Sequence, residues 1–285
     1  MAPAGLRLPR RAKNSVAAEG RARYNQRMTE ERLPGGRSFG AVRVDDEVRR
    51  PAQPWTATVH EVLRHLEGAG FDAAPRAIGF DDQGRERLTF LPGETLDEHA
   101  PWSPWLRSDD GLRQVGAWLR RLHDTTATFR PAEGAVWFTG RAWEPGLLIG
   151  HLDASPWNAV WDDGGLVGFI DWDTASPCRR EDDLAFTALT WVPLLHVELA
   201  GKMGFDNVAD RARRVHLLLD AYGYDGDRIA IRDAILRRVE RNVAVIRQLA
   251  EGGEPTFQRM LPWAADLEQS GYEVAELPDR FWRAD

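Results

Sequence analysis

The first third of the chain alternates short apolar runs with turn-forming residues, a pattern typical of a small β-sheet. One segment differs, because residues 56–66 place their apolar side chains at helical spacing on a single face. Gly68 and Gly70 follow this segment and should end the helix. The expected elements are strands at 41–44, around Val48, at 77–80 and at 87–91, with a helix at 56–66.

Further along the chain the apolar spacing becomes mainly helical. The first long helix is marked by four apolar residues in register, Leu112, Val115, Leu119 and Leu122. A β-hairpin follows it, with strands at 160–163 and 166–170 around a glycine turn. From residue 183 the pattern is helical again, and breaks are expected at Gly201, Gly223, Gly252, Gly253 and Gly271.

Together these elements predict an α+β fold with two lobes. Residues 31–91 would form a small β-rich N-terminal lobe with one main helix, and residues 92–285 a larger helical C-terminal lobe. Residues 1–30 carry seven basic and two acidic side chains and are expected to form a flexible basic tail. A cleft between two such lobes is a natural place for a ligand.

Composition narrows the class of protein. The 285 residues contain no apolar run near the roughly 18 residues that span a bilayer, and the N-terminus lacks the apolar core of a secretory signal. The single cysteine, Cys178, excludes an internal disulfide and fits a reducing cytoplasm. The net charge of -7 argues against nucleic acid as the main partner. We therefore expect a cytoplasmic protein without a membrane partner.

Two polar clusters carry the candidate chemistry. The segment GHLDASPWNAV (residues 150–160) contains Asp153 and Asn158, and GFIDWD (residues 168–173) contains Asp171. Because a hairpin joins the two segments, its end returns near its start, and the three side chains should converge. Two carboxylates and an amide oxygen are hard ligands suited to Mg²⁺, and one acid is left to accept a proton. This set matches the logic of phosphoryl transfer.

The pattern H-x-D-x₄-N followed by I-D-W-D resembles the aminoglycoside phosphotransferase family, within the protein-kinase-like fold. The helix segment LRRLHD (residues 119–124) and the later D-L-A (residues 183–185) are also similar, and the resemblance runs from about residue 33 to 195. Leu152 stands where that family commonly has glycine. The resemblance implies a bilobal kinase-like fold and ATP or GTP as phosphoryl donor.

The resemblance also assigns roles within the second lobe. It makes Asp153 the catalytic base and Asn158 and Asp171 the Mg²⁺ ligands. His151 is expected to pack beneath the loop, and Asp183 to brace the loop as a structural acid. Asp173 is either a second acid beside the site or a solvated side chain.

The segments expected to bind the nucleotide resemble the family less closely. Gly35, Gly36 and Ser38 lie where the family has its nucleotide-covering hairpin, and Phe90 and Leu91 where the hinge should meet the base. The family's phosphate-binding lysine is absent, since the chain has only Lys13 and Lys202. Arg49 is the best substitute by position, because a guanidinium binds phosphate through two donors. Its partner acid is Glu61, unless His60 is the residue of that helix that faces inward.

The acceptor is less constrained. Residues 181–285 hold 13 basic and 19 acidic side chains, which suits a polycationic aminoglycoside but also an ordinary surface. Four tryptophans are expected near the mouth of the cleft, as stacking surfaces or core fillers: Trp102, Trp105, Trp157 and Trp191. The function expected is a Mg²⁺-dependent phosphotransferase acting on a hydroxyl of a small molecule, an antibiotic above all. A non-catalytic nucleotide- or drug-binding homologue and a primary-metabolite kinase are the alternatives.

Overall fold

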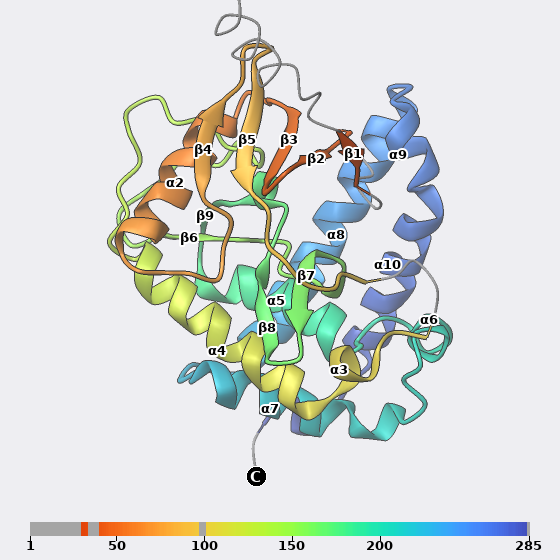
Figure 1. The fold of residues 1–285 in the computed structure, drawn as a ribbon. Coiled ribbons are helices and arrows are strands. Elements are labelled where there is room, and N and C mark those ends of the chain that lie inside the picture. The colour runs from red at the N-terminus through yellow and green to blue at the C-terminus, as the bar shows by residue number, and fades with distance from the viewer. Residues whose placement is uncertain (1–29, 34–39, 97–100, 284–285) are drawn as a thin grey trace, which may run out of the picture.

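The computed structural model describes residues 30–33, 40–96 and 101–283. It has the expected α+β fold with two lobes, a β-rich N-terminal part and a mainly helical C-terminal part (Figure 1). Among the described residues, no helix is long and apolar enough to cross a bilayer.

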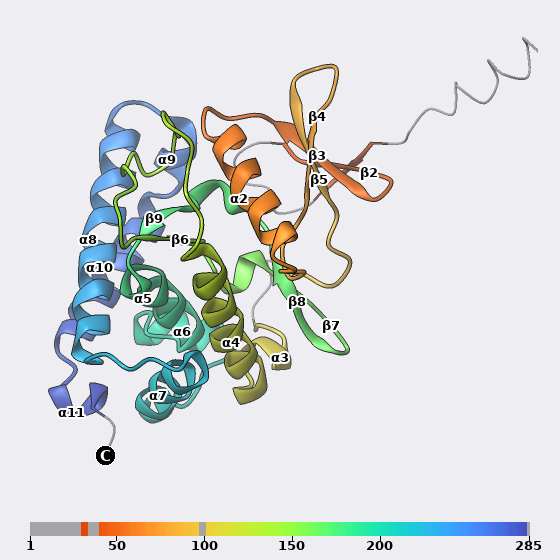
Figure 2. The same cartoon turned by 90° about the vertical axis from the view of Figure 1, so that its left-hand side faces the viewer.

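The N-terminal lobe is a five-stranded antiparallel sheet in the order β1-β2-β3-β5-β4. Its helix α2 lies against one side of the sheet, as Figure 2 shows, and buries the apolar face that the sequence predicted. The strands are β1 Glu31–Arg32, β2 Val42–Val44, β3 Glu47–Pro51, β4 Ala77–Phe80 and β5 Arg85–Thr89, and the helix is α2 Thr56–Gly68.

The C-terminal lobe contains two small two-stranded sheets among its helices. The predicted hairpin is formed by β7 and β8, and a second pair joins β6 to β9. The strands are β6 Leu148–Gly150, β7 Ala159–Asp162, β8 Gly165–Phe169 and β9 Ser176–Cys178. The helices are α3 Pro104–Arg107, α4 Asp109–Thr126, α5 Arg180–Trp191, α6 Val197–Lys202, α7 Arg211–Tyr222, α8 Ile229–Glu251, α9 Pro255–Arg259, α10 Leu261–Ala275 and α11 Asp279–Trp282.

Helix α4 forms the centre of this lobe. Its N-terminus is capped by the Ser108 hydroxyl, which accepts a hydrogen bond from the Gly111 N–H at 2.9 Å. The four apolar residues predicted to share one face are all fully buried. Gly116 allows α7 to approach closely, because a side chain there would meet the Leu218 carbonyl oxygen at 2.8 Å.

The helix breaks predicted at glycines hold at some positions and fail at others. Gly223 ends α7 in a left-handed conformation, and Gly252 follows the last residue of α8. Gly271 instead lies inside α10, so the predicted break there is wrong. A Cβ atom at Gly271 would lie 3.0 Å from a methyl carbon of Val239, so this glycine serves close packing between α10 and α8.

Several contacts fix the β7–β8 hairpin between the lobes. The Leu166 N–H donates to the Gln114 side chain of α4 at 2.7 Å. Gly168 lies directly against the backbone of Ala73, where a Cβ atom would come within 2.4 Å of the carbonyl oxygen. Gly93, on the connection between the lobes, crosses the hairpin equally closely at Trp161. The end of the hairpin is therefore held at the junction of the two lobes.

Candidate active site

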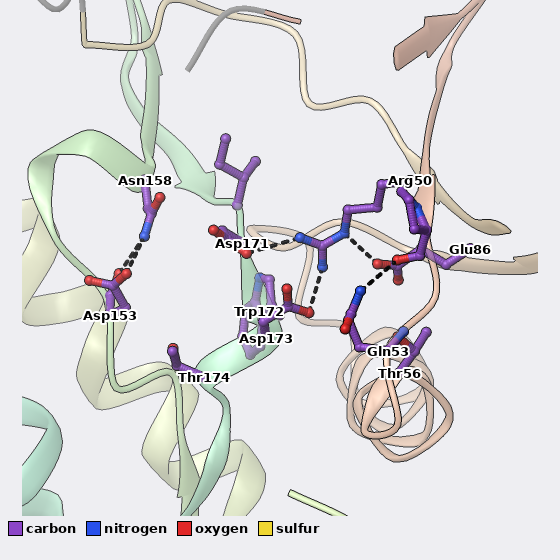
Figure 3. Close-up of polar contacts among 12 residues, drawn as sticks. Arg50, Gln53, Thr56, Glu86, Asp153, Asn158, Asp171, Trp172, Asp173 and Thr174 are labelled. Carbon is purple, nitrogen blue, oxygen red and sulfur yellow. Dashed lines mark hydrogen bonds and ion pairs between the residues drawn. The ribbon is translucent and has the colours of Figure 1, made fainter. Parts of the chain in front are cut away.

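The loop between β6 and β7 holds the Asp153 carboxylate through its own side chains (Figure 3). The Ser155 hydroxyl donates to Oδ1 of Asp153 at 2.8 Å. The Asn158 amide donates to Oδ2 at 2.9 Å and to the Asp153 carbonyl at 3.0 Å. Both carboxylate oxygens are thus positioned by residues of the same short loop.

Asp183, at the start of α5, braces this loop from below. Its carboxylate accepts hydrogen bonds from the backbone N–H groups of His151 at 2.8 Å and Leu152 at 2.7 Å, and contacts Nε2 of His123 at 3.0 Å. Gly150 permits the approach, because a Cβ atom there would lie 2.6 Å from the carboxylate. Burial opposes the charged form, but these hydrogen bonds hold the pKa of Asp183 below its usual value.

His151 is fully buried beneath the loop. Its Nε2 lies 3.1 Å from the Ile170 carbonyl, and its Nδ1 accepts from the Asp153 N–H at 3.3 Å. Burial lowers the pKa of His151, so the ring is neutral at neutral pH. The ring therefore links the loop to the end of strand β8 and does not face a ligand.

Leu152 adopts a left-handed backbone conformation, with φ of 61°. The aminoglycoside phosphotransferase family, which the sequence motifs resemble, commonly has glycine at this position, and only glycine adopts this conformation without steric cost. The Leu152 side chain is 3% exposed, so its burial offsets part of that cost.

Asp171 follows β8, and the hairpin closes as the sequence predicted. The Ile170 N–H donates to the Asn158 carbonyl at 2.9 Å, which joins the two polar segments directly. Asp171 also has a left-handed backbone, with φ of 61°, and its side chain is 51% exposed. Its charge is close enough to raise the pKa of Asp153.

Arg50 on β3 reaches across from the sheet to both acids of the IDWD segment (Figure 3). Its guanidinium donates to Asp171 at 3.0 Å and to Asp173 at 2.8 Å. Burial alone would lower the pKa of Arg50, but the carboxylates of Asp173, Glu86 and Asp171 raise it above its usual value. Asp173 is buried in this pair rather than solvated.

Arg49, the expected substitute for the lysine, lies away from the two acids, and the adjacent Arg50 contacts them. Arg49 is hydrogen bonded to Glu47 on the other face of the strand, at 3.2 and 3.3 Å, and does not meet Asp171. Successive strand residues point to opposite faces, so a shift of one position exchanges the two sides. Arg50 is the arginine that faces the second lobe.

The partner acid also differs from the expected one. Glu61 is exposed, and His60 is the residue of α2 that faces inward, fully buried. Glu86 of β5 connects the two, because its carboxylate is hydrogen bonded to Arg50 and lies 3.1 Å from Nε2 of His60. The acid that holds the arginine therefore comes from the neighbouring strand and not from the helix.

Arg50 and Glu86 were both missed, although the sequence contained a signal for each. Val48 and Leu88 are apolar strand residues that face the core side, and Arg50 and Glu86 each lie two positions away on the same face. The register pairs Arg50 with Glu86 directly. A strict period of two along each strand would have selected this pair.

Burial raises the pKa of two acids at this junction, Asp153 and Asp173, and so favours their neutral form. It raises the pKa of Asp153 to about 7, against the hydrogen bonds from Ser155 and Asn158. It raises the pKa of Asp173 to about 6, although Arg50 opposes the change. A carboxylate whose pKa lies near neutrality is suited to accept a proton in a reaction.

The side chains of Asn158 and Asp171 fit a hard divalent cation. The Asn158 amide nitrogen is used by Asp153, so its oxygen is left for a ligand, and Asp171 gives one oxygen to Arg50 and keeps the other. An amide and a carboxylate oxygen are ligands that Mg²⁺ accepts together with phosphate oxygens and water. The described residues contain no group of three or more His, Cys, Asp or Glu side chains that could hold a metal alone.

The structure describes only some of the other residues that were expected to bind the nucleotide. Gly35, Gly36 and Ser38 lie outside the described residues. Phe90 and Leu91 lie on the connection between the lobes, and the Phe90 N–H already donates to the Asp46 carbonyl at 2.8 Å. The Phe90 ring packs against the guanidinium of Arg43 at 3.9 Å.

The four tryptophans separate into core and partly exposed residues. Trp102 and Trp191 are buried in the core of the helical lobe. Trp105 stacks on Trp161 at 5.7 Å. Trp157, on the loop between β6 and β7, is half-buried and meets Trp263 of α10 edge to face at 5.9 Å.

Sequence comparison finds one informative relative. No protein-family model matches the chain. The trifolitoxin immunity protein of Rhizobium leguminosarum bv. trifolii is 41% identical over 196 residues, which is 67% of this chain and 73% of that protein.

Solved structures of kinases share the fold. An amicoumacin kinase, hAmiN, in complex with AMP-PNP, Ca²⁺ and Ami aligns with a TM-score of 0.62 at 12% identity, over 92% of this chain and 98% of that one. A choline/ethanolamine kinase family protein from Mesorhizobium loti gives 0.59 at 16% identity, over 92% and 96%. The gentamicin complex of APH(2")-IIa gives 0.54 at 14%, over 95% and 99%. The kinase-like fold that the sequence motifs implied is thereby confirmed.

Proposed function

This chain belongs to the family of the trifolitoxin immunity protein and has the fold of small-molecule kinases, and we propose that it phosphorylates a hydroxyl group of a toxin or antibiotic, with a nucleoside triphosphate as donor. One observation carries the proposal. Asp153, Asn158 and Asp171 come from two segments joined by one hairpin, and Arg50 of the other lobe is bonded to Asp171. This is the set of groups that phosphoryl transfer needs.

Asp153 is the proposed catalytic base. Ser155 and Asn158 fix the direction of its carboxylate, so that an acceptor hydroxyl can be oriented for attack in line with the phosphate. Its pKa of about 7 lets it exist as a carboxylate at neutral pH and still take up the proton.

Asn158 and Asp171 are the proposed ligands of Mg²⁺, which supplies neutralisation of charge on the triphosphate when it is bound. Arg50 is the proposed phosphate contact in place of the family's lysine, since a guanidinium binds phosphate through two parallel hydrogen bonds. Phe90 and Leu91 remain proposed contacts of the nucleobase. Gly35, Gly36 and Ser38 remain proposed contacts of the phosphates.

The name of the relative supports resistance as the biological role. That protein is described as giving immunity to trifolitoxin, and a transferred phosphate would add charge to a toxin and change what it binds. The nucleotide donor and the single cysteine, Cys178, make the cytoplasm the proposed place of action.

The test is a transfer assay with the purified full chain. The protein is incubated with Mg²⁺ and either ATP or GTP against trifolitoxin and a panel of hydroxyl-bearing antibiotics, and mass spectrometry looks for the gain of one phosphoryl group. Asp153→Ala should lose transfer by at least about 10²-fold while still binding nucleotide. Asp171→Ala should lose Mg²⁺-dependent nucleotide binding. Wild-type turnover by both variants would refute the assignment.

One observation favours a second candidate, a non-catalytic protein that binds nucleotide or toxin. Arg50 is bonded to both Asp171 and Asp173, so one of the two Asp171 oxygens is already used and only the other is left for a metal-bound nucleotide. The two candidates differ in hydrolysis. Slow nucleotide hydrolysis that requires Mg²⁺ and Asp153 supports the kinase, whereas tight toxin binding without any hydrolysis supports the binding protein.

A further inference from the structure

A buried arginine of α8, Arg238, lies beneath the loop that holds Asp153. Its side chain is 9% exposed, and its Nη2 donates to the Leu152 carbonyl at 2.6 Å, directly before Asp153. The guanidinium lies over the ring of Phe186 at 4.8 Å. Its Nε has no hydrogen-bond partner, and across residues 30–33, 40–96 and 101–283 no carboxylate is within ion-pair distance of it.

The acids closest to this arginine are already engaged. Asp183 is bonded to His123 and to the loop backbone, and Asp153 to Ser155 and Asn158. Burial lowers the pKa of Arg238 to about 10, so it stays charged at neutral pH. The charges of Asp153 and Asp183 raise its pKa, but neither carboxylate lies within ion-pair distance, so among the described residues no anion is bonded to this guanidinium and a ligand carboxylate could be.

Arg241 adds a second positive charge on the same face of α8. It lies three residues further along the helix, on the surface, and its charge is close enough to lower the pKa of Arg238. In the part of the chain that the structure describes, Arg241 has no ion-pair partner. Two positive charges therefore lie on the side of the loop that α8 covers, although residues 181–285 as a whole are acidic, which had suggested a polycationic acceptor.

An aromatic surface continues from the arginine to the catalytic loop. Phe186, which lies under the Arg238 guanidinium, meets Trp157 edge to face at 6.1 Å, and Trp157 meets Trp263 at 5.9 Å. Trp157 lies between Asp153 and Asn158 in the sequence, and both tryptophans are half-buried. An apolar group held there would lie beside the proposed base.

We propose that the acceptor is a hydroxyl compound bearing a carboxylate and an apolar or aromatic group, and not a polycation. Arg238 and Arg241 bind the carboxylate, and Trp157 and Trp263 pack against the apolar group. The acceptor oxygen then forms a bond to the γ-phosphorus, the bond from that phosphorus to the leaving nucleoside diphosphate breaks, and the hydroxyl proton passes to Asp153. This inference rests on the proposed function for the reaction, but its binding part can be tested without it.

The test uses two matched probes, N-benzoylserine and N-benzoylserinamide, which share the ring and the hydroxyl and differ in the charged carboxylate. Their binding to the full chain is measured by calorimetry. We expect the acid to bind at least about tenfold more tightly than the amide, and Arg241→Ala to remove that difference. Arg237→Ala, an exposed neighbour on the same helix, is the matched control and should keep it.

Arg238→Lys tests the buried position while keeping the charge. We expect the variant to bind N-benzoylserine about tenfold more weakly and to bind N-benzoylserinamide as the wild type does. The reason is that lysine cannot form the two parallel hydrogen bonds of a guanidinium. A merely structural role of Arg238 would change the binding of both probes equally. Equal binding of acid and amide by the wild-type protein, or binding of neither probe, would overturn the inference.

The transfer assay separates this inference from the proposed function. Phosphoryl transfer to N-benzoylserine but not to its amide supports both the phosphotransferase function and the carboxylate-bearing acceptor. Transfer to gentamicin with no transfer to N-benzoylserine supports the phosphotransferase function and overturns the inference about the acceptor. Preferential binding of the acid without transfer or nucleotide hydrolysis supports the arginine site and counts against the kinase.

Discussion

At the scale of single residues, Asp153 is held where its charged form is least stable. Burial raises its pKa to about 7, well above the value of 3.8 for an ordinary aspartate. Between these two values the folded protein keeps a proton that the unfolded chain has released. The stability contributed by Asp153 is therefore present at low pH and is lost as the pH rises through about 7.

This difference predicts a pH-dependent effect of Asp153→Asn, which cannot titrate. The free energy of unfolding of the variant relative to the wild type should increase by about 3 kcal/mol between pH 4.5 and pH 8. Urea unfolding of the full chain in EDTA measures it without bound metal or nucleotide. Asp163→Asn, on the exposed hairpin turn, gives the baseline for exchanging a surface acid. A relative stability of Asp153→Asn that falls toward high pH would contradict the burial argument.

Residue identity could be predicted better than residue direction. Asp153, Asn158 and Asp171 were selected because their spacing and residue types point to one chemistry. The arginine that contacts the two acids is one position from the one expected, because β3 reads EVRRP and either arginine carries the right charge. The choice depends on which face of the strand meets the second lobe, and that is set by the pairing of Arg50 with Glu86, 36 residues away in sequence.

At the scale of elements, the loop between β6 and β7 contains a strained backbone position. Leu152 has φ of 61° and a buried side chain. Replacing it by alanine or glycine removes the same packing, but only glycine also relieves the backbone strain. We therefore expect Leu152→Gly to be more stable than Leu152→Ala by about 1 kcal/mol.

This order is the reverse of the usual one, in which glycine is the less stable of the two. Thermal or urea unfolding of both variants measures it, and both should be less stable than the wild type by about 2–4 kcal/mol. Leu119→Gly and Leu119→Ala, in the middle of α4, form the control pair, where alanine should be the more stable. If alanine were also favoured at position 152, the left-handed conformation would not be a source of strain.

Elements defined by local periodicity were predicted closely, and those defined by distant pairing were not. The hairpin and α2 begin and end within about two residues of their predicted positions. The pair β6–β9 was missed, because each strand has three residues and the partners are separated by the whole β6–β7 loop and the β7–β8 hairpin. The role of Gly271 was missed because it depends on the approach of α8.

At the scale of the whole molecule, one arginine links the two lobes. Arg50 belongs to the N-terminal sheet, where Glu86 holds it, and its other bonds go to Asp171 and Asp173 of the C-terminal lobe. Arg50 and Glu86 are buried, as is Asp173. The same side chain therefore stabilises the contact between the lobes and is the proposed contact of the nucleotide phosphates.

Arg50→Ala should consequently change stability and nucleotide binding together. Removing one member of a buried ion pair leaves uncompensated charges on Glu86 and Asp173, which costs about 3 kcal/mol or more in the free energy of unfolding. Arg49→Ala is the matched control, since Arg49 pairs with Glu47 on the other face of the same strand and should cost less than about 1 kcal/mol. Urea unfolding measures the loss of stability, and calorimetry with Mg²⁺ and a non-hydrolysable ATP analogue measures the loss of nucleotide binding.

Because a lysine keeps the charge but bonds to fewer oxygens, Arg50→Lys should recover part of both losses. If Arg49→Ala weakened nucleotide binding as much as Arg50→Ala, the direction of β3 would not decide which arginine serves the site.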